Sequence, residues 1–336
     1  MPQQKTRNTD YSQHMPHLDF EYDDHYYPND EDVPDPQVEP IIPGARVPIN
    51  KVGVSGVDLP VKLIRRDGTN QTLHAKVSLY GSLDNPNAKG LNLSRFPIVM
   101  HEEIADNLSI DGIINILNRL QTTQNSSNVY CKMAFKYPWV QDALRTRVTL
   151  PDNTPNEHVF KIVDGKKLSF NKMQGFIFYD CIIEGQKLHD QYKFFLTVNY
   201  IYSSTCPCSF ELAQSARLSR GKAANGHSQR SVAKITIQFD HNNPIFIEDV
   251  VEMARRQIPT EVIVICKRRD EQAFAELNGS NLLFTEDSIR LLYEGLDQWF
   301  DDGRISDFSI VTDHLESLHP WQATAIISKG ITNGLR

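Results

Sequence analysis

Two thiols and an imidazole lie close together in this sequence, in types and at spacings that could support chemistry. Cys206 and Cys208 flank a proline and follow the apolar and aromatic run 192–202, and His227 comes after a stretch of small and basic residues. Thiolates and imidazoles bind zinc-like metal ions and also act as nucleophiles and proton carriers. Because a strand over 192–202 would bring both thiols to one place, the stretch predicts a metal site or a reactive thiolate.

The proline between the two cysteines affects how they are presented. Pro207 has no amide hydrogen and biases Cys206 toward an extended conformation, so we expect a turn at the strand end with both sulfurs near solvent. A C-x-C pair supplies only half of a zinc site, so further ligands must come from elsewhere in the chain. Two turn thiols without a function are the alternative interpretation.

A carboxylate and an imidazole near residue 316 could complete such a site. Glu316 and His319 are three residues apart and lie next to His314. Pro320 follows at once and favours a turn or strand end over a helix. With cysteine and histidine they would form the mixed sulfur, nitrogen and oxygen ligand set of catalytic zinc-like sites, which keep one position for water. A polar strand edge without chemistry is the alternative.

A charged run at 267–271 is a further candidate. It follows the apolar β-branched run 261–266, for which we expect a strand, and it ends on Glu271. A solvated turn is the usual role of such a run. If it faces a pocket instead, its cations suit phosphate, and Glu271 suits a metal ion or a guanidine-like edge.

The hydrophobic pattern predicts an α+β fold. Alternation predicts strands at 52–64, 71–80, 128–137, 175–184, 191–202, 231–239, 305–311 and 324–328, and helical spacing predicts helices at 109–120, 244–257 and 285–300. Ser109 is the expected N-cap of the first helix. This order fits two tandem units, each an antiparallel sheet with a helix pair on one face. We expect the first unit at residues 47–188 and the second, with most candidate residues, at 189–336.

Charge is unevenly distributed along the 336 residues. Residues 1–46 hold ten acidic and three basic residues, which account for the whole net charge of −7, so the body of the chain is neutral. A neutral body lacks the broad basic surface of a duplex nucleic-acid binder. The acidic segment has no apolar periodicity, so we expect a disordered tail whose His14, His17 and His25 are solvated.

Neither a membrane span nor a disulfide framework is expected. No run approaches the roughly 18 apolar residues of a membrane helix, and the start of the sequence has no signal-peptide pattern, so the expected location is the cytoplasm. Five cysteines are an odd number in such a chain, which argues against a disulfide framework. Cys131, Cys181 and Cys266 lie in apolar or mixed surroundings and are expected to be small buried residues.

Seven short motifs give the chain a specific resemblance. They are Lys51–Gly56, Leu93–Phe96, Ser204–Ser209, His227–Ser231, Lys267–Glu271, Phe284–Asp287 and Leu315–His319. In these motifs and in their order, residues 48–330 resemble the type IB GTP cyclohydrolases of the tunnelling-fold (T-fold) superfamily. The resemblance implies two tandem T-fold units that oligomerise into barrels, as a homotetramer with sites at subunit boundaries.

The resemblance also implies a reaction and a metal ion. The reaction is hydrolysis of GTP to formate and 7,8-dihydroneopterin triphosphate, the first step of pterin and folate synthesis. The cofactor is a divalent metal ion: zinc, manganese or iron. The implied metal ligands are Cys206, His227, Glu271 and His319. The implied catalytic residues are Cys206, His227, His319 and the companion acid Glu316, and Cys208 is left as a secondary thiol.

Substrate contacts follow from the resemblance and from charge. Glu286 falls where these enzymes are expected to hold the edge of the guanine ring. The triphosphate needs cations, and the candidates by charge alone are Arg230, Arg95, Lys222 and Arg268. The implied partners are therefore GTP and further copies of the chain, with no nucleic acid and no membrane.

Two other functions remain open at this point. A T-fold nitrile reductase of queuosine synthesis would use a cysteine nucleophile and NADPH in place of a metal ion. A non-catalytic purine- or metal-binding module would keep only the fold. The motifs at His227 and at Glu316 and His319 favour the cyclohydrolase. Two departures from the family concern details: 217–225 resembles an inserted loop, and Pro320-Trp321 follows where a second polar residue is commoner.

Overall fold

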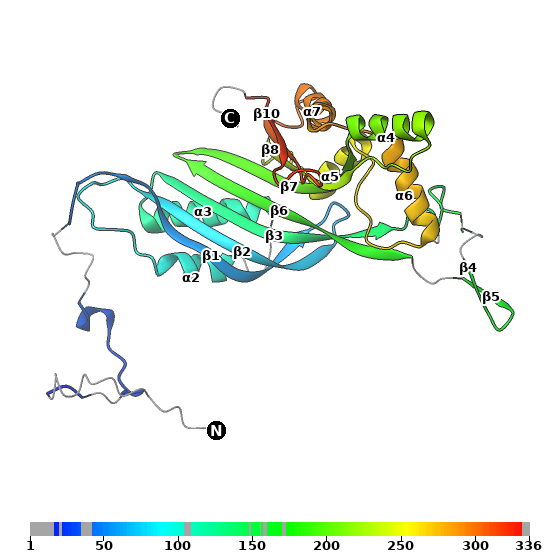
Figure 1. Cartoon of the computed structure of the whole chain (residues 1–336). Coiled ribbons are helices and arrows are strands. Elements are labelled where there is room, and N and C mark those ends of the chain that lie inside the picture. The colour runs from blue at the N-terminus through cyan, green and yellow to red at the C-terminus, as the bar shows by residue number, and fades with distance from the viewer. Residues whose placement is uncertain are drawn as a thin grey trace.

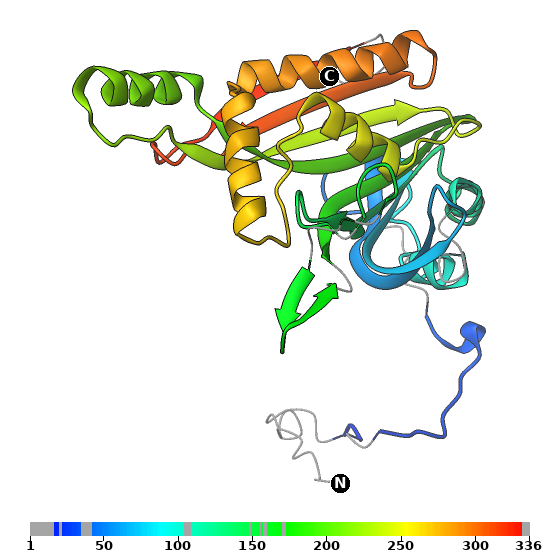
Figure 2. The ribbon, with the colours of Figure 1, turned by 90° about the vertical axis from the view of Figure 1, so that its right-hand side faces the viewer.

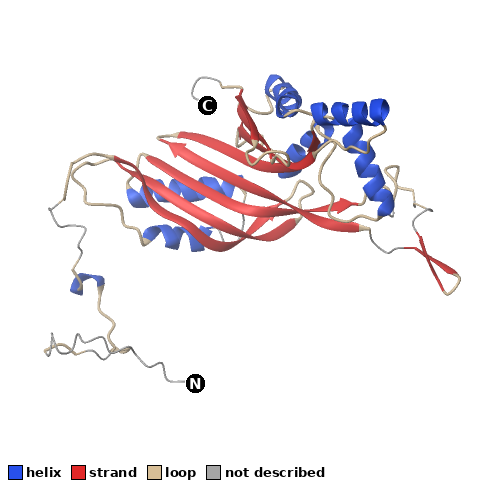
Figure 3. Ribbon diagram, in the orientation of Figure 1, coloured by secondary structure: helices blue, strands red, loops and turns tan. Residues whose placement is uncertain are grey.

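One antiparallel sheet of eight strands dominates the molecule (Figures 1 and 3). The computed structural model describes residues 17–19, 22–34, 42–103, 109–147, 149–154, 156, 160–169 and 173–330. The strand order is β1-β2-β3-β6-β7-β8-β9-β10, so each strand of this sheet pairs with the one that precedes it in the chain. All the pairings are antiparallel.

The sequence alternation predicted every strand of this sheet. Their bounds are β1 Ile49–Ile64, β2 Asn70–Leu83, β3 Asn128–Asp142, β6 Gln174–Leu188, β7 Gln191–Thr205, β8 Ser228–Phe239, β9 Asp307–His314 and β10 Ala323–Ser328. Gly68, in the turn between β1 and β2, has a φ of +79°, which glycine adopts without steric cost. A separate hairpin of β4 (Phe160–Val163) and β5 (Lys166–Ser169) projects from the sheet in Figure 1.

The described residues form six α-helices. They are α2 Arg95–Glu103, α3 Ile110–Gln124, α4 Pro207–Arg220, α5 Ile247–Gln257, α6 Arg268–Ser280 and α7 Thr285–Asp301. Helices α3, α5 and α7 are the three predicted from helical spacing. The N-cap prediction is also confirmed, because Ser109 Oγ accepts a hydrogen bond from the Gly112 N–H at 3.0 Å.

The hydrophobic core lies between the sheet and helices α3, α5 and α7 (Figure 2). Phe194, Leu196, Val198 and Tyr200, every second residue of β7, are buried on this face, as a strand with one face against a core requires. The other face of the sheet is more open. Residues Phe176, Phe178 and Ile326 are exposed there. The predicted α+β class, an antiparallel sheet with helices on one face, is therefore confirmed.

The sheet runs without a break across the predicted boundary between two units. β6 ends at Leu188 and β7 begins at Gln191, and these two residues pair. Before the turn between β6 and β7, the sheet strands β1 and β2 are followed by helices α2 and α3 and then by β3 and β6. After it come β7 and β8 with α4 between them, then helices α5, α6 and α7, and then β9 and β10. The division into units at 47–188 and 189–336 stays a prediction.

The prediction of a turn at Cys206-Pro207-Cys208 is wrong, and that of an inserted loop at 217–225 is wrong in part. The chain forms helix α4 with Cys206 as its N-cap, residues 217–220 belong to this helix, and residues 221–225 are irregular. Proline is tolerated at the first helical position because the N–H there would have no partner within the helix. Helix α4 ends at Gly221, which has a φ of +61°.

The prediction of a strand at 261–266 is also wrong. Glu261 makes only an isolated bridge with Tyr202. The charged run that follows is not a turn but the start of α6, where the Asp270 carboxylate accepts a hydrogen bond from the Lys267 N–H at 2.8 Å. This contact satisfies one of the backbone donors that every helix start leaves without a partner.

Cysteine burial follows the expectation in two cases of three. Cys131 and Cys181 are buried, whereas Cys266 is exposed. The reason lies in the backbone, because a buried small residue was expected on a strand, and Cys266 instead precedes α6 in an irregular segment. Helix α2 was not predicted at all.

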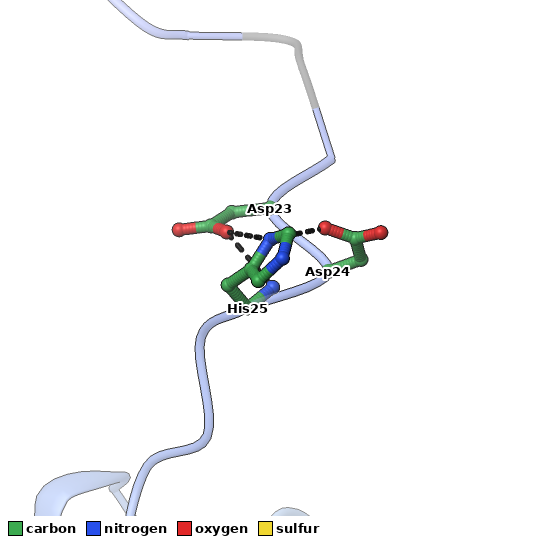
Figure 4. A group of neighbouring side chains, drawn as sticks. All are labelled: Asp23, Asp24 and His25. Carbon is green, nitrogen blue, oxygen red and sulfur yellow. Dashed lines mark hydrogen bonds and ion pairs between the residues drawn. The ribbon is translucent and has the colours of Figure 1, made fainter.

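The acidic tail is described only in part. Residues 1–16, 20–21 and 35–41, with His14 among them, lie outside the described residues, so the predicted disorder is not tested there. The side chains of Asp23, Asp24 and His25 bring three ligand atoms within 4.8 Å of one another (Figure 4). All three are exposed, as in many acidic clusters that hold no ion.

Among the described residues, no helix combines the length and apolar character that crossing a bilayer requires.

Candidate active site

The candidate thiol lies where β7 ends and α4 begins. Cys206 follows the last residue of β7, and its N–H donates to the carbonyl of His227 at 3.2 Å. This hydrogen bond brings the backbones of Cys206 and His227 together. Cys206 is partly exposed and Cys208, in the first turn of α4, is exposed.

The imidazole of His227 contacts two side chains. Its Nδ1 lies 3.0 Å from Gln229 Oε1 and 3.8 Å from Glu316 Oε2. The backbone N–H of His227 donates to Ser209 Oγ at 3.0 Å, so the first turn of α4 also holds the start of β8. His227 and Glu316 keep only 19% and 12% of their side-chain surface exposed. The pair is thus mostly shielded from water.

Glu316 reaches His227 because the loop after β9 is tied to β8. The Leu315 N–H donates to the Arg230 carbonyl at 3.2 Å, which extends the β8–β9 pairing by one contact. As predicted, the segment forms no helix. His319 lies further along this loop, is exposed, and stacks on Trp321 with ring centroids 4.1 Å apart. It contacts Trp321 instead of Glu316.

Glu271 lies in the first turn of α6 and lines a cleft of about 660 Å³. Ser228, Gly226 and Cys266 line the same cleft. Because side chains alternate along a strand, Ser228 points away from the face on which Gln229 contacts His227. Glu271 therefore borders the same strand start as His227, on its other face.

The described residues do not gather the four proposed metal ligands into one cluster. Among them, Asp23, Asp24 and His25 are the one group of three or more ligand atoms that lie within 4.8 Å of one another. The structure brings His227 and Glu316 together and joins Cys206 to His227 through the backbone. It leaves the Glu271 and His319 side chains apart from that pair.

Asp270 anchors the helix that carries Glu271. Its carboxylate accepts hydrogen bonds from the N–H groups of Arg145 and Thr146 at 2.7 and 2.9 Å, and from the Thr146 hydroxyl at 2.5 Å. Burial opposes ionisation, but these hydrogen bonds outweigh it and lower the pKa of Asp270. The start of α6 is thus fixed against the segment that follows β3.

The proposed substrate contacts lie on several elements. Glu286 is exposed in the first turn of α7, and Arg268 and Arg230 are exposed at the starts of α6 and β8. Arg95, at the start of α2, donates to the Thr123 carbonyl at 2.5 Å. Figures 1 and 2 show α2 at a different end of the molecule from α6, so Arg95 does not join Arg268 within one chain.

Sequence reasoning missed Gln229. It lies two residues after His227, and residues at this spacing share a face of a strand. The predicted strand 231–239 began after both residues, whereas β8 begins at Ser228, so the periodicity could have placed Gln229 beside His227 only if the strand had been extended toward His227. The contact with Glu316 could not be found this way, because it depends on how the loop after β9 folds.

Comparisons with known proteins agree on one family. The model of type I GTP cyclohydrolase FolE2 matches residues 34–157 and 153–325. GTP cyclohydrolase FolE2 of Roseobacter denitrificans is 35% identical over 317 residues, covering 94% of this chain and 78% of the relative. The FolE2 of a Ruegeria species is 34% identical over 324 residues, covering 95% and 80%.

A solved structure with a similar chain path is uricase from Arthrobacter globiformis. It has a TM-score of 0.46 and 9% identity, and the match covers 88% of this chain and 98% of the uricase. Similarity at that level supports no argument about this chain. The sequence matches are decisive by contrast, since they run through all the proposed ligands: the chain belongs to the type I GTP cyclohydrolase FolE2 family.

Proposed function

We propose that this chain hydrolyses GTP to formate and 7,8-dihydroneopterin triphosphate, the first step of pterin and folate synthesis. The observation that carries the proposal is the family match, which spans the motifs at Cys206, His227, Glu271, Glu316 and His319. We place the reaction in the cytoplasm, where GTP is available.

The donor atoms of the proposed site suit a divalent metal ion. Cys206 and His227 supply a thiolate and an imidazole from residues joined by a backbone hydrogen bond. Glu271 and His319 would add a carboxylate and a second imidazole. Mixed sulfur, nitrogen and oxygen donors fit zinc and also allow manganese or iron.

Opening the imidazole ring of guanine requires water to add at C8. A bound divalent cation would make hydroxide available near neutral pH. His227 and His319 are the imidazoles that can move protons as N7 and N9 become leaving groups. We assign Glu316 the role of orienting His227, because its carboxylate lies beside that ring and His319 stacks on Trp321.

Substrate binding would draw on charges around this site. We propose that Glu286 holds the guanine edge and that Arg230, Arg268 and Lys222 contact the triphosphate. Arg95 lies at another end of the chain, so it would have to come from a neighbouring subunit. This agrees with a homotetramer whose sites lie at subunit boundaries.

A turnover assay tests the proposal. Purified protein with manganese and GTP is expected to release formate and a pterin that becomes fluorescent on oxidation. Cys206→Ala is expected to abolish both products, and Glu271→Gln to lower the bound metal. Cys266→Ala, which removes an exposed thiol outside the proposed ligand set, serves as the matched control and should keep activity.

Two results would contradict the assignment. Full GTP turnover by Cys206→Ala would remove the thiolate from the mechanism. Absence of formate from wild-type protein loaded with metal would favour a non-catalytic module. Oxidation of NADPH by a cyano-deazapurine would instead favour the nitrile reductase.

A further inference from the structure

We propose that Gln229 is a positioning residue, which holds the His227 imidazole in the tautomer with the proton on Nδ1 and leaves Nε2 to bind the metal ion. The inference rests on the ligand role proposed for His227. It assigns a function to a buried side chain that does not itself contact substrate or metal.

The contact geometry favours one direction of the hydrogen bond. Nδ1 of His227 faces two oxygens, Gln229 Oε1 at 3.0 Å and Glu316 Oε2 at 3.8 Å. An ionised carboxylate only accepts hydrogen bonds. A lone pair on Nδ1 would point toward that negative charge, whereas a proton there is attracted by both oxygens. Nδ1 therefore carries the proton and donates it to Gln229.

The other end of the Gln229 amide is also held. Its Nε2 donates to Ser204 Oγ at 2.8 Å, and Ser204 Oγ lies 2.8 Å from Ser231 Oγ. Ser204 lies directly across from Gln229 in the pairing of β7 with β8. Rotating the amide by half a turn would set its NH₂ group against the protonated Nδ1. The Ser204 hydroxyl can donate or accept, so it holds the amide in place, and the contact with the ring selects the orientation.

Burial raises the free-energy cost of moving the Gln229 amide out of this orientation. Gln229 is 7% exposed, and Ser204 and Ser231 are fully buried. Buried polar groups need a hydrogen-bond partner, and each one left without a partner costs free energy. The two strands therefore hold the amide in place before any metal ion arrives, and the amide holds the ring.

The two ring nitrogens of His227 would then have different roles: Nδ1 donates a hydrogen bond to Gln229, and Nε2 binds the metal ion. Histidines that bind metals usually donate their other N–H to an oxygen, which orients the ring and raises its basicity. Here the oxygen is a neutral amide, with the Glu316 carboxylate at a longer distance. Loss of such a partner typically weakens metal binding by about 10–100-fold.

The tautomer can be read directly from the protein without metal. Nitrogen-15 NMR of the imidazole rings distinguishes a protonated Nδ1 from a protonated Nε2, and His227→Asn identifies the signals of this ring. We expect the Nδ1–H form at a pH where the ring is neutral. A predominant Nε2–H form in the wild type would overturn the proposal, and this result needs neither activity nor a variant of Gln229.

Metal affinity provides the second measurement. Gln229→Leu removes the acceptor at similar size, and its dissociation constant for zinc, measured by competition with a chelating dye, is expected to rise about 10–100-fold. Gln229→Glu keeps an acceptor oxygen and should bind zinc within a few-fold of the wild type. Gln238→Leu is the matched control, since Gln238 lies at the other end of β8 and its Oε1 has no hydrogen-bond partner among the described residues.

The outcomes separate this inference from the proposed function. Wild-type affinity in Gln229→Leu, or an equal loss in Gln238→Leu, would overturn the positioning role. If Gln229→Leu does not fold, the comparison of Gln229→Glu with the wild type and the tautomer measurement decide. A wild type that binds zinc but does not turn over GTP would refute the reaction and leave the result for Gln229 standing.

Discussion

Burial separates two histidines that lie at the same end of the sheet. His314 is 2% exposed and lies 3.0 Å from the Tyr202 hydroxyl and 3.3 Å from the Ser288 hydroxyl. Burial lowers its pKa to about 4, although the nearby carboxylates of Glu286 and Asp313 act in the other direction. His314 is therefore neutral at pH 7 and belongs to the core, whereas His227 borders the proposed site.

The neutral His314 makes the stability of the protein depend on pH. The pKa of His314 is about 4 in the folded protein, below the ordinary histidine value of 6.5. Between these two pH values the unfolded chain therefore binds more protons than the folded protein does. This contribution to the free energy of unfolding is complete above pH 6.5. It should fall by on the order of 3 kcal/mol as the pH drops from 6.5 to 4. Urea denaturation of the wild type and His314→Gln across this range measures it.

The variant should be less stable at pH 7 but show a flatter pH dependence. His101→Gln is the control, because His101 is exposed at the end of α2 and its removal should leave the slope unchanged. Parallel curves for the wild type and His314→Gln would contradict the prediction.

At the scale of elements, Gly185 lets helix α3 approach β6. A Cβ at this position would lie 2.5 Å from Ile113 Cγ2 and 3.1 Å from Phe194 Cε1. Gly185→Ala is therefore expected to lower the free energy of unfolding by about 1–3 kcal/mol. Gly279→Ala, in α6, would meet nothing within 4 Å and should raise it by about 0.5–1 kcal/mol. Chemical denaturation that gives both variants the same sign would show that close packing is not the cause.

A partly buried ion pair joins α5 to the segment that leads into α6. Arg255 Nε donates to Glu261 Oε2 at 2.9 Å, and the same carboxylate accepts hydrogen bonds from Tyr179 and, at 2.8 Å, from Gln141. Arg255→Met would leave the 8% exposed Glu261 without its cation. We expect a loss of about 3–5 kcal/mol in the free energy of unfolding.

The adjacent residue provides the control for this pair. Arg256 is exposed on the same helix, so Arg256→Met should change stability by less than about 0.5 kcal/mol. Denaturant titrations of the two variants compare the same substitution at neighbouring positions. Equal effects would mean that the ion pair with Glu261 does not stabilise the fold.

The elements that could be predicted from the sequence are those with one apolar face. Helix α7 buries Ile289, Leu292 and Leu296 at helical spacing, and strand β7 alternates. Helix α4 buries only two alanines, and α6 buries only Asp270 and Asn278. These two helices have no apolar stripe, so periodicity could not reveal them.

The sequence predicted which residues form the candidate site but not how their side chains are arranged. The motifs identified Cys206, His227 and Glu316 because thiols, imidazoles and carboxylates are chemically distinctive. The approach of Glu316 to His227 depends on the hydrogen bond from Leu315 to Arg230, which no local pattern encodes. Contacts between segments distant in sequence are set by the whole fold.

For the whole molecule, the open face of the sheet bears on assembly. Phe176, Phe178 and Ile326 are exposed on this face by 60%, 49% and 72%. Apolar residues on an open sheet face agree with the proposed homo-oligomer, whose contacts would remove them from water. Arg95 fits the same proposal, because α2, which begins with Arg95, lies away from α6 in Figures 1 and 2.

Sites shared between subunits predict complementation. Arg95→Ala and Cys206→Ala are each expected to lose GTP turnover when expressed alone. When the two variants are expressed together, mixed oligomers would contain some sites with both native residues, so part of the activity should return. GTP turnover by the co-purified protein measures the recovered activity, and light scattering measures its oligomeric state.

A pair of variants that share one site provides the control. Cys206→Ala mixed with His227→Ala should stay inactive, since both changes fall on the same chain's part of the site. A monomer in solution, or no recovery from the Arg95 and Cys206 mixture, would contradict shared sites.

Two hydrogen bonds hold the start of α4 against the start of β8. The Cys206 N–H donates to the carbonyl of His227, and the His227 N–H donates to Ser209 Oγ, so the segment between these residues begins and ends at the same place. Doubling the length of a closed flexible loop costs only about 0.6 kcal/mol. The irregular segment 222–226, between α4 and β8, could therefore be longer at small cost while the backbones at the thiol and the imidazole stay joined, which is compatible with an inserted loop beside an intact site.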